Sequence, residues 1–111
     1  MTGAGRGGGR NFGLEVAKRG GAVVCADVNL EAAQETVALL EAQGAKGFAI
    51  HCDVGEAEQV KKLAEESEAL LGHPVTMVIN NAGVGLGGKF DELSLDDWKW
   101  CMHVNLWGVI H

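Results

Sequence analysis

The chain has 111 residues, which suits one domain or part of one, and 47% of them are apolar. Its net charge of −6 argues against a nucleic-acid partner, because an acidic surface repels phosphate backbones. The three cysteines form no CxxC pair, which argues against a disulfide framework or a metal site and favours reduced thiols in a cytoplasmic protein. No apolar run reaches the ~18 residues of a membrane span, so we expect no membrane partner.

The apolar pattern alternates between two periods along the chain. Apolar positions three or four apart predict helices, and short continuous apolar runs predict buried strands. The expected helices cover residues 8–20, 29–44, 56–71 and 94–111. The expected strands cover residues 22–26, 47–52 and 75–79, and each runs into a polar residue: Asp27, Asp53 and Asn80. Strands that alternate with helices indicate parallel βαβ units in an α/β fold.

Two helix details can be read from single residues. Phe12 and Val16 are spaced four apart in the first predicted helix, so we expect both to face inward. Ser94 is the expected N-cap of the last helix, and Asp97 stands three residues later in the acidic position of a capping box.

The stretch Thr2–Gly9 reads TGAGRGGG and opens the first predicted helix. A helix N-terminus offers unpaired N–H groups and a partial positive charge, which suit a pyrophosphate. Glycine allows the tight turn and the close approach of a phosphate. Alone this stretch is a weak signal. However, Asp27 follows about 18 residues after Gly9, near the ~20-residue spacing of the carboxylate that binds an adenine ribose.

Asp27 also bears on the choice of cofactor. A carboxylate accepts hydrogen bonds from a ribose 2′-OH and repels a 2′-phosphate, which favours NAD over NADP. Arg6 favours the opposite choice, because a cation in this loop could lie near a 2′-phosphate. We give Asp27 more weight because it would meet the 2′ position directly. The alternative, that Asp27 is only a turn or capping residue, stays open.

These motifs together resemble the short-chain dehydrogenase/reductase family, of the type with a single Rossmann domain. The matching features are Thr2–Gly9 as TGxxxGxG, Asp27, Asp53-Val54, the NNAG of residues 80–83, and Asn105. The resemblance spans nearly the whole chain. It implies that residues 1–111 are a partial NAD(P)-binding domain with a doubly wound parallel sheet.

The resemblance also implies a role for individual residues. The implied cofactor-binding residues are Gly3, Gly5, Arg6, Gly7, Gly8, Gly9, Asp27, Asp53, Val54, Asn81, Ala82 and Gly83. The glycines and Arg6 would form the pyrophosphate loop, Asp27 would hold the adenosine ribose, and the Asp53 carboxylate would accept the adenine amino group. The NAG residues would border the ribose on the nicotinamide side, while Asn80 would brace the sheet.

Asn105 would hold a water in the proton-relay path, which makes it the one implied catalytic residue. Simpler interpretations remain: Asp53 as a turn residue, Asn105 as an ordinary helix residue. We expect the three tryptophans, Trp98, Trp100 and Trp107, to be packing or interface residues.

Two parts of the family pattern have no counterpart in this sequence. The family's first strand would precede Thr2, and it would lie between the second and fourth strands of the sheet. The family's general acid/base is the tyrosine of a YxxxK motif, aided by a serine, and this chain has no tyrosine. We therefore expect an incomplete domain, without the first strand and the C-terminal half, either a partial sequence or the product of a downstream start codon.

Three interpretations of function stay open at this point. The first is the cofactor half of an NAD-dependent oxidoreductase that acts on secondary alcohols or ketones, homo-oligomeric at full length. The second is an inactive module that holds NAD or binds full-length relatives, and the third is a fragment that does not fold. For these 111 residues alone we expect no dehydrogenase turnover and weak or no NAD binding.

Overall fold

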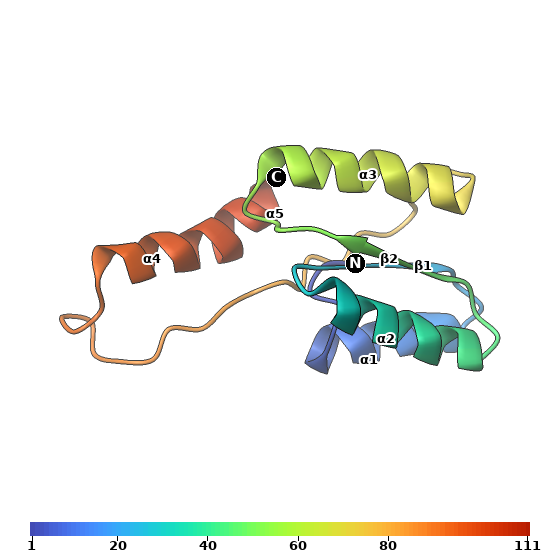
Figure 1. The fold of residues 1–111 in the computed structure, drawn as a ribbon, viewed down its shortest axis with the longest axis horizontal. Helices are drawn as coiled ribbons and strands as arrows, with labels where there is room; N and C mark the ends of the chain where they lie inside the picture. Colours follow the sequence, from blue (N-terminus) through green and yellow to red (C-terminus); the bar gives the residue numbers. More distant parts are fainter.

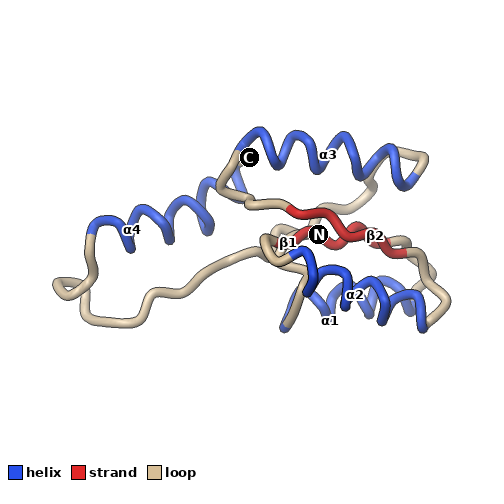
Figure 2. The backbone as a smooth tube through the Cα atoms, in the orientation of Figure 1, coloured by secondary structure: helices blue, strands red, loops and turns tan.

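The computed structural model describes residues 1–111 and has an α/β architecture (Figure 1). The elements in chain order are α1 (Gly7–Lys18), β1 (Val23–Asp27), α2 (Leu30–Ala42), β2 (Gly47–His51), α3 (Ala57–Leu71), α4 (Leu95–Met102), the π-helix η1 (His103–Trp107) and α5 (Gly108–Ile110). β1 and β2 pair in parallel, from Val23 opposite Gly47 to Asp27 opposite His51. Helices α1 and α2 lie on one side of the strands and α3 on the other (Figure 2). This arrangement confirms the predicted doubly wound α/β class.

The inner face of α1 consists of small residues. Gly9, Gly13 and Ala17 are buried, whereas Phe12 is 51% exposed, so the prediction that Phe12 faces inward was wrong. A Cβ on Gly13 would lie 3.1 Å from the end of the Met1 side chain and 3.9 Å, an ordinary contact distance, from both Leu40 and Thr36 of α2. The predicted period of the helix was right, but the buried stripe lies one position further along.

Most of the apolar core lies between β1, α1 and α2. Cys25, Ala33 and Leu40 are fully buried there, together with Ala4. Burial raises the pKa of the Cys25 thiol to about 11, because a thiolate would lose its hydration at this site. A smaller cluster of Ala26, Cys52 and Val54 forms the opposite face, towards α3.

Residues 75–79 do not form the strand that their apolar run predicts. A strand needs a neighbour for its backbone N–H and C=O groups. Here only Met1 and Thr2 lie between this segment and β1. Met1 forms hydrogen bonds with Val24 and Ala26, Thr2 bridges to Ala26, and the Thr2 N–H donates to the carbonyl of Ile79 at 3.0 Å. Met77 and Val78 are accordingly 67% and 69% exposed. The sheet of this chain therefore has two strands, with an apolar segment beside it.

The C-terminal helix begins as predicted. The Ser94 hydroxyl accepts from the Asp97 N–H at 3.1 Å, and the Asp97 carboxylate accepts from the Ser94 N–H at 3.0 Å. The Ser94 hydroxyl also donates to the Asp97 carboxylate at 2.6 Å, and this bond, together with that from the Ser94 N–H, holds the pKa of the Asp97 carboxyl below its usual value. The helix continues through η1 to Ile110, and no helix of the structure combines the length and apolarity needed to cross a membrane.

Two glycines allow this helix to contact the turn after β2. A Cβ on Gly108 would lie 2.6 Å from a methyl carbon of Val54, and a Cβ on Gly55 would overlap the ring of His103. His103 also has its Nε2 atom 3.4 Å from the Glu56 carboxylate, and His111 Nδ1 lies 3.0 Å from the Val54 carbonyl. The helix is thus attached by these close contacts and by Val104, which packs against the cluster of Ala26, Cys52 and Val54.

Candidate functional site

A cleft of about 430 Å³ opens where β1 and β2 end, beside the start of α1. Most of the predicted cofactor-binding residues line it: Gly3, Arg6, Gly8, Asp27, Asp53, Val54, Asn81, Ala82 and Gly83. Gly5, Gly7 and Gly9 shape the loop next to the cleft without lining it. Clefts at the carboxyl ends of parallel strands are the usual ligand sites of open α/β sheets. A second hollow of similar volume lies at the outer edge of β2 and contains none of these residues.

Two loop glycines are required by the space around them. Gly3 has φ +62°, and a Cβ there would lie 2.8 Å from the Ala82 Cα. A Cβ on Gly9 would overlap the carbonyl oxygen of Gly3 and lie 2.7 Å from the Asn81 side-chain nitrogen. The loop is therefore closed tightly against residues 81 and 82.

The N-terminus of α1 has unpartnered backbone donors. The N-cap residue Arg6 makes no side-chain capping bond, and the first turn contains no acidic residue. The N–H groups of Gly7, Gly8 and Gly9 have no hydrogen-bond partner in the protein. These donors and the helix dipole favour an anion at this end of the helix.

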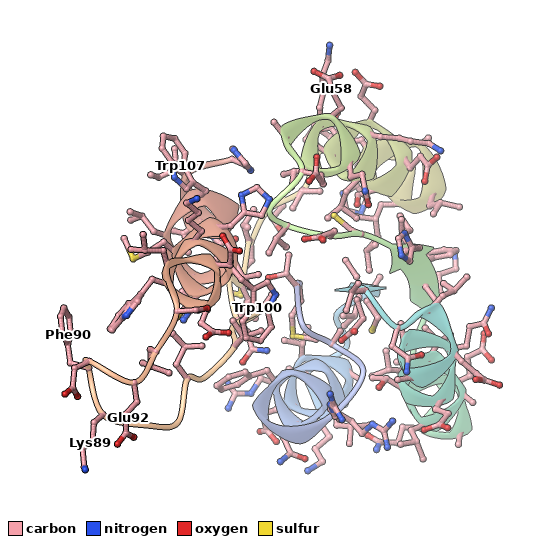
Figure 3. All side chains as sticks on the ribbon, turned by 60° about the vertical axis from the view of Figure 1, so that its left-hand side comes forward. Glu58, Lys89, Phe90, Glu92, Trp100 and Trp107 are labelled. Carbon is pink, nitrogen blue, oxygen red and sulfur yellow. The ribbon has the colours of Figure 1, made fainter.

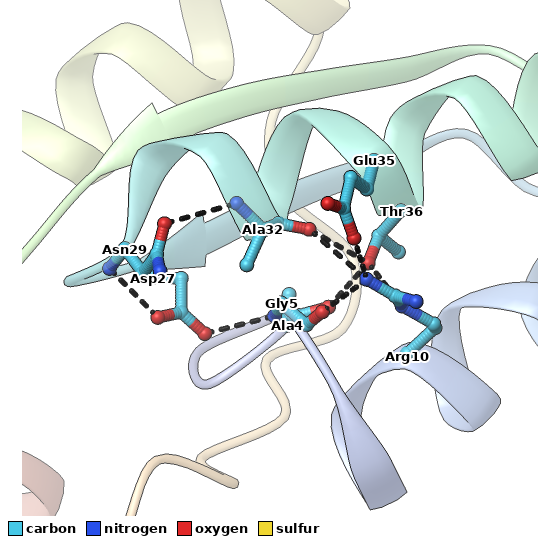
Figure 4. Close-up of polar contacts among 8 residues, drawn as sticks. All are labelled: Ala4, Gly5, Arg10, Asp27, Asn29, Ala32, Glu35 and Thr36. Atoms are coloured by element: carbon cyan, nitrogen blue, oxygen red, sulfur yellow. Dashed lines mark hydrogen bonds and ion pairs between the residues drawn. The ribbon is translucent and has the colours of Figure 1, made fainter.

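Asp27 connects the glycine loop to the start of α2 (Figure 4). Its Oδ2 atom accepts from the Gly5 N–H at 2.8 Å, and its Oδ1 atom accepts from the Asn29 N–H at 2.9 Å. A Cβ on Gly5 would lie 2.7 Å from the Ala32 Cβ and 2.9 Å from Asp27 Oδ2. Asp27 thus serves as a turn residue and also lines the cleft, so the two interpretations of it from sequence are compatible.

Asp53 occupies the matching place after β2. Its Oδ1 atom accepts from the Gly55 N–H at 2.9 Å, which makes the turn that the sequence allowed as an alternative. Its own N–H donates to the Gln59 side chain at 2.9 Å. The other carboxylate oxygen has no partner in the protein and remains able to accept a hydrogen bond at the cleft.

Asn81, rather than Asn80, fastens the NNAG segment. The Asn81 side chain donates to the carbonyls of Thr2 and Gly3 at 3.2 and 3.0 Å. The Thr2 hydroxyl in turn accepts from the N–H groups of Asn81 and Ala82 at 3.2 and 3.1 Å. Asn80 is exposed and makes no hydrogen bond, so the expected bracing role of Asn80 was wrong. The second asparagine lies next to the glycine loop, and the first points away from any partner.

Asn105 lies in the π-helix and does not line the cleft. Its side-chain oxygen accepts from the Val84 N–H and its nitrogen donates to the Val84 carbonyl, both at 2.8 Å. The nitrogen also lies 3.3 Å from the sulfur of Cys101. Single π turns inside α-helices are frequent at functional sites, and this one directs Asn105 towards the segment that follows NNAG.

The cleft also contains residues that sequence reasoning did not select. Trp100 and Val104 reach it from the helix that begins with α4, and Trp100 is drawn on that helix in Figure 3. Val28, Cys52 and Val84 complete its wall. The i, i+4 spacing of Trp100 and Val104 places them on one helix face, which was the available signal. Trp100, 49% exposed, is thus a wall of the cleft as well as a surface residue.

Comparison with known proteins identifies the family. The sequence model described as short chain dehydrogenase matches residues 1–111. The Cα-dehydrogenase of Sphingobium sp. is 38% identical over 110 residues, which cover 99% of this chain and 35% of that protein. A short chain dehydrogenase/reductase from Burkholderia phymatum, solved in complex with NAD, has a TM-score of 0.95 and 41% identity and covers 100% of this chain.

An alcohol dehydrogenase from Thermococcus sibiricus, complexed with 5-hydroxy-NADP, has a TM-score of 0.92 and 30% identity over 99% of this chain. The chain spans 39% of the Burkholderia protein and 47% of the Thermococcus protein, so it corresponds to less than half the length of these relatives. The family model and the similar structures agree. The chain belongs to the short-chain dehydrogenase family.

Proposed function

We propose that residues 1–111 are the partial dinucleotide-binding domain of an NAD-dependent oxidoreductase that interconverts secondary alcohols and ketones. The observation that carries this proposal is the joint position of Gly8 and Asp27 on one cleft, with unpartnered N–H groups on one wall and a fixed carboxylate on the other. A dinucleotide needs both features, because its pyrophosphate is an anion and its adenosine ribose is a donor.

The residues of the cleft fit the parts of the cofactor in order. The N–H groups at the start of α1 would bind the pyrophosphate, and Asp27 would accept from the adenosine ribose hydroxyls. The free oxygen of Asp53 would accept from the adenine amino group, beside the apolar side chain of Val54. Ala82 and Gly83 would border the ribose on the nicotinamide side, with Asn81 holding their backbone in place.

Preference for NAD over NADP is part of the proposal and rests on Asp27. The similar structures include one with NAD and one with an NADP derivative, so relatives use both types of cofactor. Arg6 is exposed and lines the same cleft, where it would favour a 2′-phosphate. The Asp27 carboxylate is fixed by two backbone N–H groups, so it would repel that phosphate from a defined position.

The reaction belongs to the whole protein rather than to these residues alone. When bound, the nicotinamide ring accepts a hydride from an alcohol or donates one to a ketone. This chain contributes the cofactor cradle and Asn105, which holds the Val84 backbone and, by family resemblance, a water for proton transfer. Because the sequence has no tyrosine, we expect no turnover from residues 1–111 by themselves. We further propose a cytoplasmic, homo-oligomeric protein with a small-molecule substrate.

The test is a titration of the ¹⁵N-labelled chain with NAD⁺ and with NADP⁺, followed by amide NMR. We expect weak binding of NAD⁺ that shifts the amides of Gly7, Gly8 and Gly9, and weaker binding of NADP⁺. Asp27→Asn should lower NAD⁺ affinity about tenfold and shrink the preference over NADP⁺, since hydrogen bonds to charged groups contribute about 1.5–3 kcal/mol.

Glu31→Gln is the matched control, because it removes an exposed carboxylate from the first turn of α2 without touching the cleft. It should leave both affinities unchanged. Loop amides that do not respond to NAD⁺, or Asp27→Asn with unchanged selectivity, would overturn the proposal. The same titration distinguishes a binding module from a chain that does not fold, because the latter gives an undispersed spectrum.

A further inference from the structure

Arg10 lies between the glycine loop and α2, outside the cleft itself (Figure 4). Its Nε atom donates to the Thr36 hydroxyl at 3.0 Å, and its Nη2 atom donates to the Gly5 carbonyl and to Glu35. The Arg10 side chain is only 26% exposed, whereas that of Glu35 is 65% exposed. An exposed ion pair contributes little, so the bonds to the loop and to Thr36 are the important ones.

Thr36 holds the preceding carbonyl of the same loop. Its side chain is fully buried, and its hydroxyl donates to the Ala4 carbonyl at 2.8 Å. The hydroxyl is also the acceptor for Arg10, so the two side chains form one chain of hydrogen bonds. The carbonyl of Ala4 is thereby bound by Thr36 of α2, and that of Gly5 by Arg10 of α1.

These contacts fix the peptide unit that meets Asp27. The peptide between Ala4 and Gly5 has its oxygen bound by Thr36 and its N–H bound by Asp27. The next peptide, between Gly5 and Arg6, has its oxygen bound by Arg10. Rotation of the Ala4–Gly5 peptide would break its bond to Thr36 and turn the Gly5 N–H away from the carboxylate. Arg10 acts on this peptide through the Thr36 hydroxyl, to which it donates, and it holds the next peptide directly. Gly5 has no Cβ to resist that rotation by itself.

We propose that Arg10 is a positioning residue: with Thr36 it fixes the orientation of Gly5, which holds the Asp27 carboxylate towards the cleft and so maintains the preference for NAD over NADP. The ligand part of this inference rests on the proposed function. The Arg10–Gly5–Asp27 contacts themselves do not, so they can be tested in the free protein.

The experiment compares three variants of the chain: Arg10→Met, Arg10→Lys and Arg19→Met. Arg19 follows α1 and pairs with Glu15 at 3.2 Å, far from the loop, so it controls for the loss of an arginine and an ion pair. Amide hydrogen exchange is measured without nucleotide, and the affinities for NAD⁺ and NADP⁺ are measured by the same NMR titration.

In the wild type the Gly5 amide should exchange much more slowly than that of Gly7, which has no partner. In Arg10→Met the two should exchange at similar rates, NAD⁺ affinity should fall about tenfold, and NADP⁺ affinity should fall less. Arg10→Lys should recover part of both effects, because lysine keeps the charge and one of the contacts. Arg19→Met should match the wild type.

A Gly5 amide that stays protected in Arg10→Met overturns the inference whether or not nucleotide binds. So does a variant that melts earlier but keeps the NAD⁺ to NADP⁺ ratio, because Arg10 would then support only the fold. If Arg10→Met does not fold, Arg10→Lys is the test, because the inference requires this variant to lose part of the exchange protection of the Gly5 amide. Failure of the wild type to bind NAD⁺ counts against the proposed function alone, because the exchange data still test the contacts of Arg10, Gly5 and Asp27 in the free protein.

Discussion

Residues 2–54 and residues 75–111 each supply one wall of the cleft, but they are held by different forces. All the buried apolar side chains lie between Ala4 and Val54. In the second region only Gly108 is buried, and large apolar residues such as Met77, Leu95 and Ile110 are more than half exposed. That region is attached by hydrogen bonds at Thr2, by the contacts of the C-terminal helix with residues 54–56, and by two half-buried residues, Ala82 and Val104, that pack against the smaller apolar cluster.

The two ends of the proposed cofactor site are therefore expected to differ in local stability. Burial of apolar area supplies most of the free energy of folding, so the loop, Asp27 and Asp53 stand on the better-packed part. Segments with few buried contacts open at lower free energy than the core. We therefore expect the adenosine side of the cleft to be preformed and the side with Asn105 to open more readily.

The largest expected effect comes from breaking the packed region. Leu40→Ala removes a fully buried side chain and should lower the free energy of unfolding by about 2–5 kcal/mol. Leu95→Ala is the matched control in the second region, where the side chain is 77% exposed, and should cost less than about 0.5 kcal/mol. Urea denaturation followed by circular dichroism measures both. Equal losses would mean that the two regions do not differ in packing.

Alkaline pH should weaken the packed region in a graded way. The pKa of the Cys25 thiol is raised from 9.0 to about 11, so the unfolded chain releases this proton at lower pH than the folded one. The contribution of this thiol to the free energy of unfolding is fully present below pH ~9. It falls by about 2–3 kcal/mol as the pH rises to ~11. Cys25→Ala should flatten that slope, although not completely, because burial also raises the pKa of Cys52. A slope identical to wild type contradicts the prediction.

Substitution at Gly9 tests the junction between the regions. Gly9→Ala places a methyl group against the Gly3 carbonyl and the Asn81 side chain, and should cost about 1–3 kcal/mol and abolish the amide shifts caused by NAD⁺. Gly8→Ala is its neighbour and control, since the nearest atom to its Cβ, in Asn81, would be 3.5 Å away. Alanine there should be neutral or stabilise the helix by up to ~1 kcal/mol. Thermal denaturation of both variants measures the change in stability. A similar loss in Gly8→Ala and Gly9→Ala would contradict the prediction that the Gly9 contacts are the specific cause.

The smallest effect should come from loosening the second region alone. Asn81→Ala removes two bonds to the Thr2 and Gly3 carbonyls and should cost about 1–2 kcal/mol, seen as faster amide exchange in residues 80–84. Exchange in β1 and β2 should stay close to wild type. Asn80→Ala, which loses no hydrogen bond, should change neither the stability nor the exchange of residues 80–84. Uniformly faster exchange in Asn81→Ala would show that both regions unfold as one unit.

Local signals in the sequence were sufficient where a residue acts on its near neighbours. The capping box of Ser94 and Asp97, the strands β1 and β2 and the glycine loop before α1 were all predicted correctly, although only β1 is buried along most of its length. Asp27 and Asp53 could be placed at one edge of the sheet because the ends of parallel strands meet there. The other predicted residues that line the cleft were implied by the family resemblance.

Contacts between distant segments could not be read in this way. The run at residues 75–79 has strand composition, but pairing depends on a neighbour that periodicity does not supply. The bonds from Asn81 to Thr2 and from Arg10 to Thr36 join residues far apart in sequence, so no spacing rule indicates them. Phe12 was misplaced because small residues, which carry little hydrophobic signal, form the packed face of α1.

The close approach of Gly55 to the His103 ring has a mechanical consequence for the whole cleft. This glycine stands two positions after Asp53, and the histidine stands two positions before Asn105. A side chain introduced at residue 55 would displace the His103 ring, which is 45% exposed, or move the helix that carries both His103 and Asn105. The absence of a side chain at residue 55 therefore lets the helix that carries Asn105 lie directly against the turn that carries Asp53.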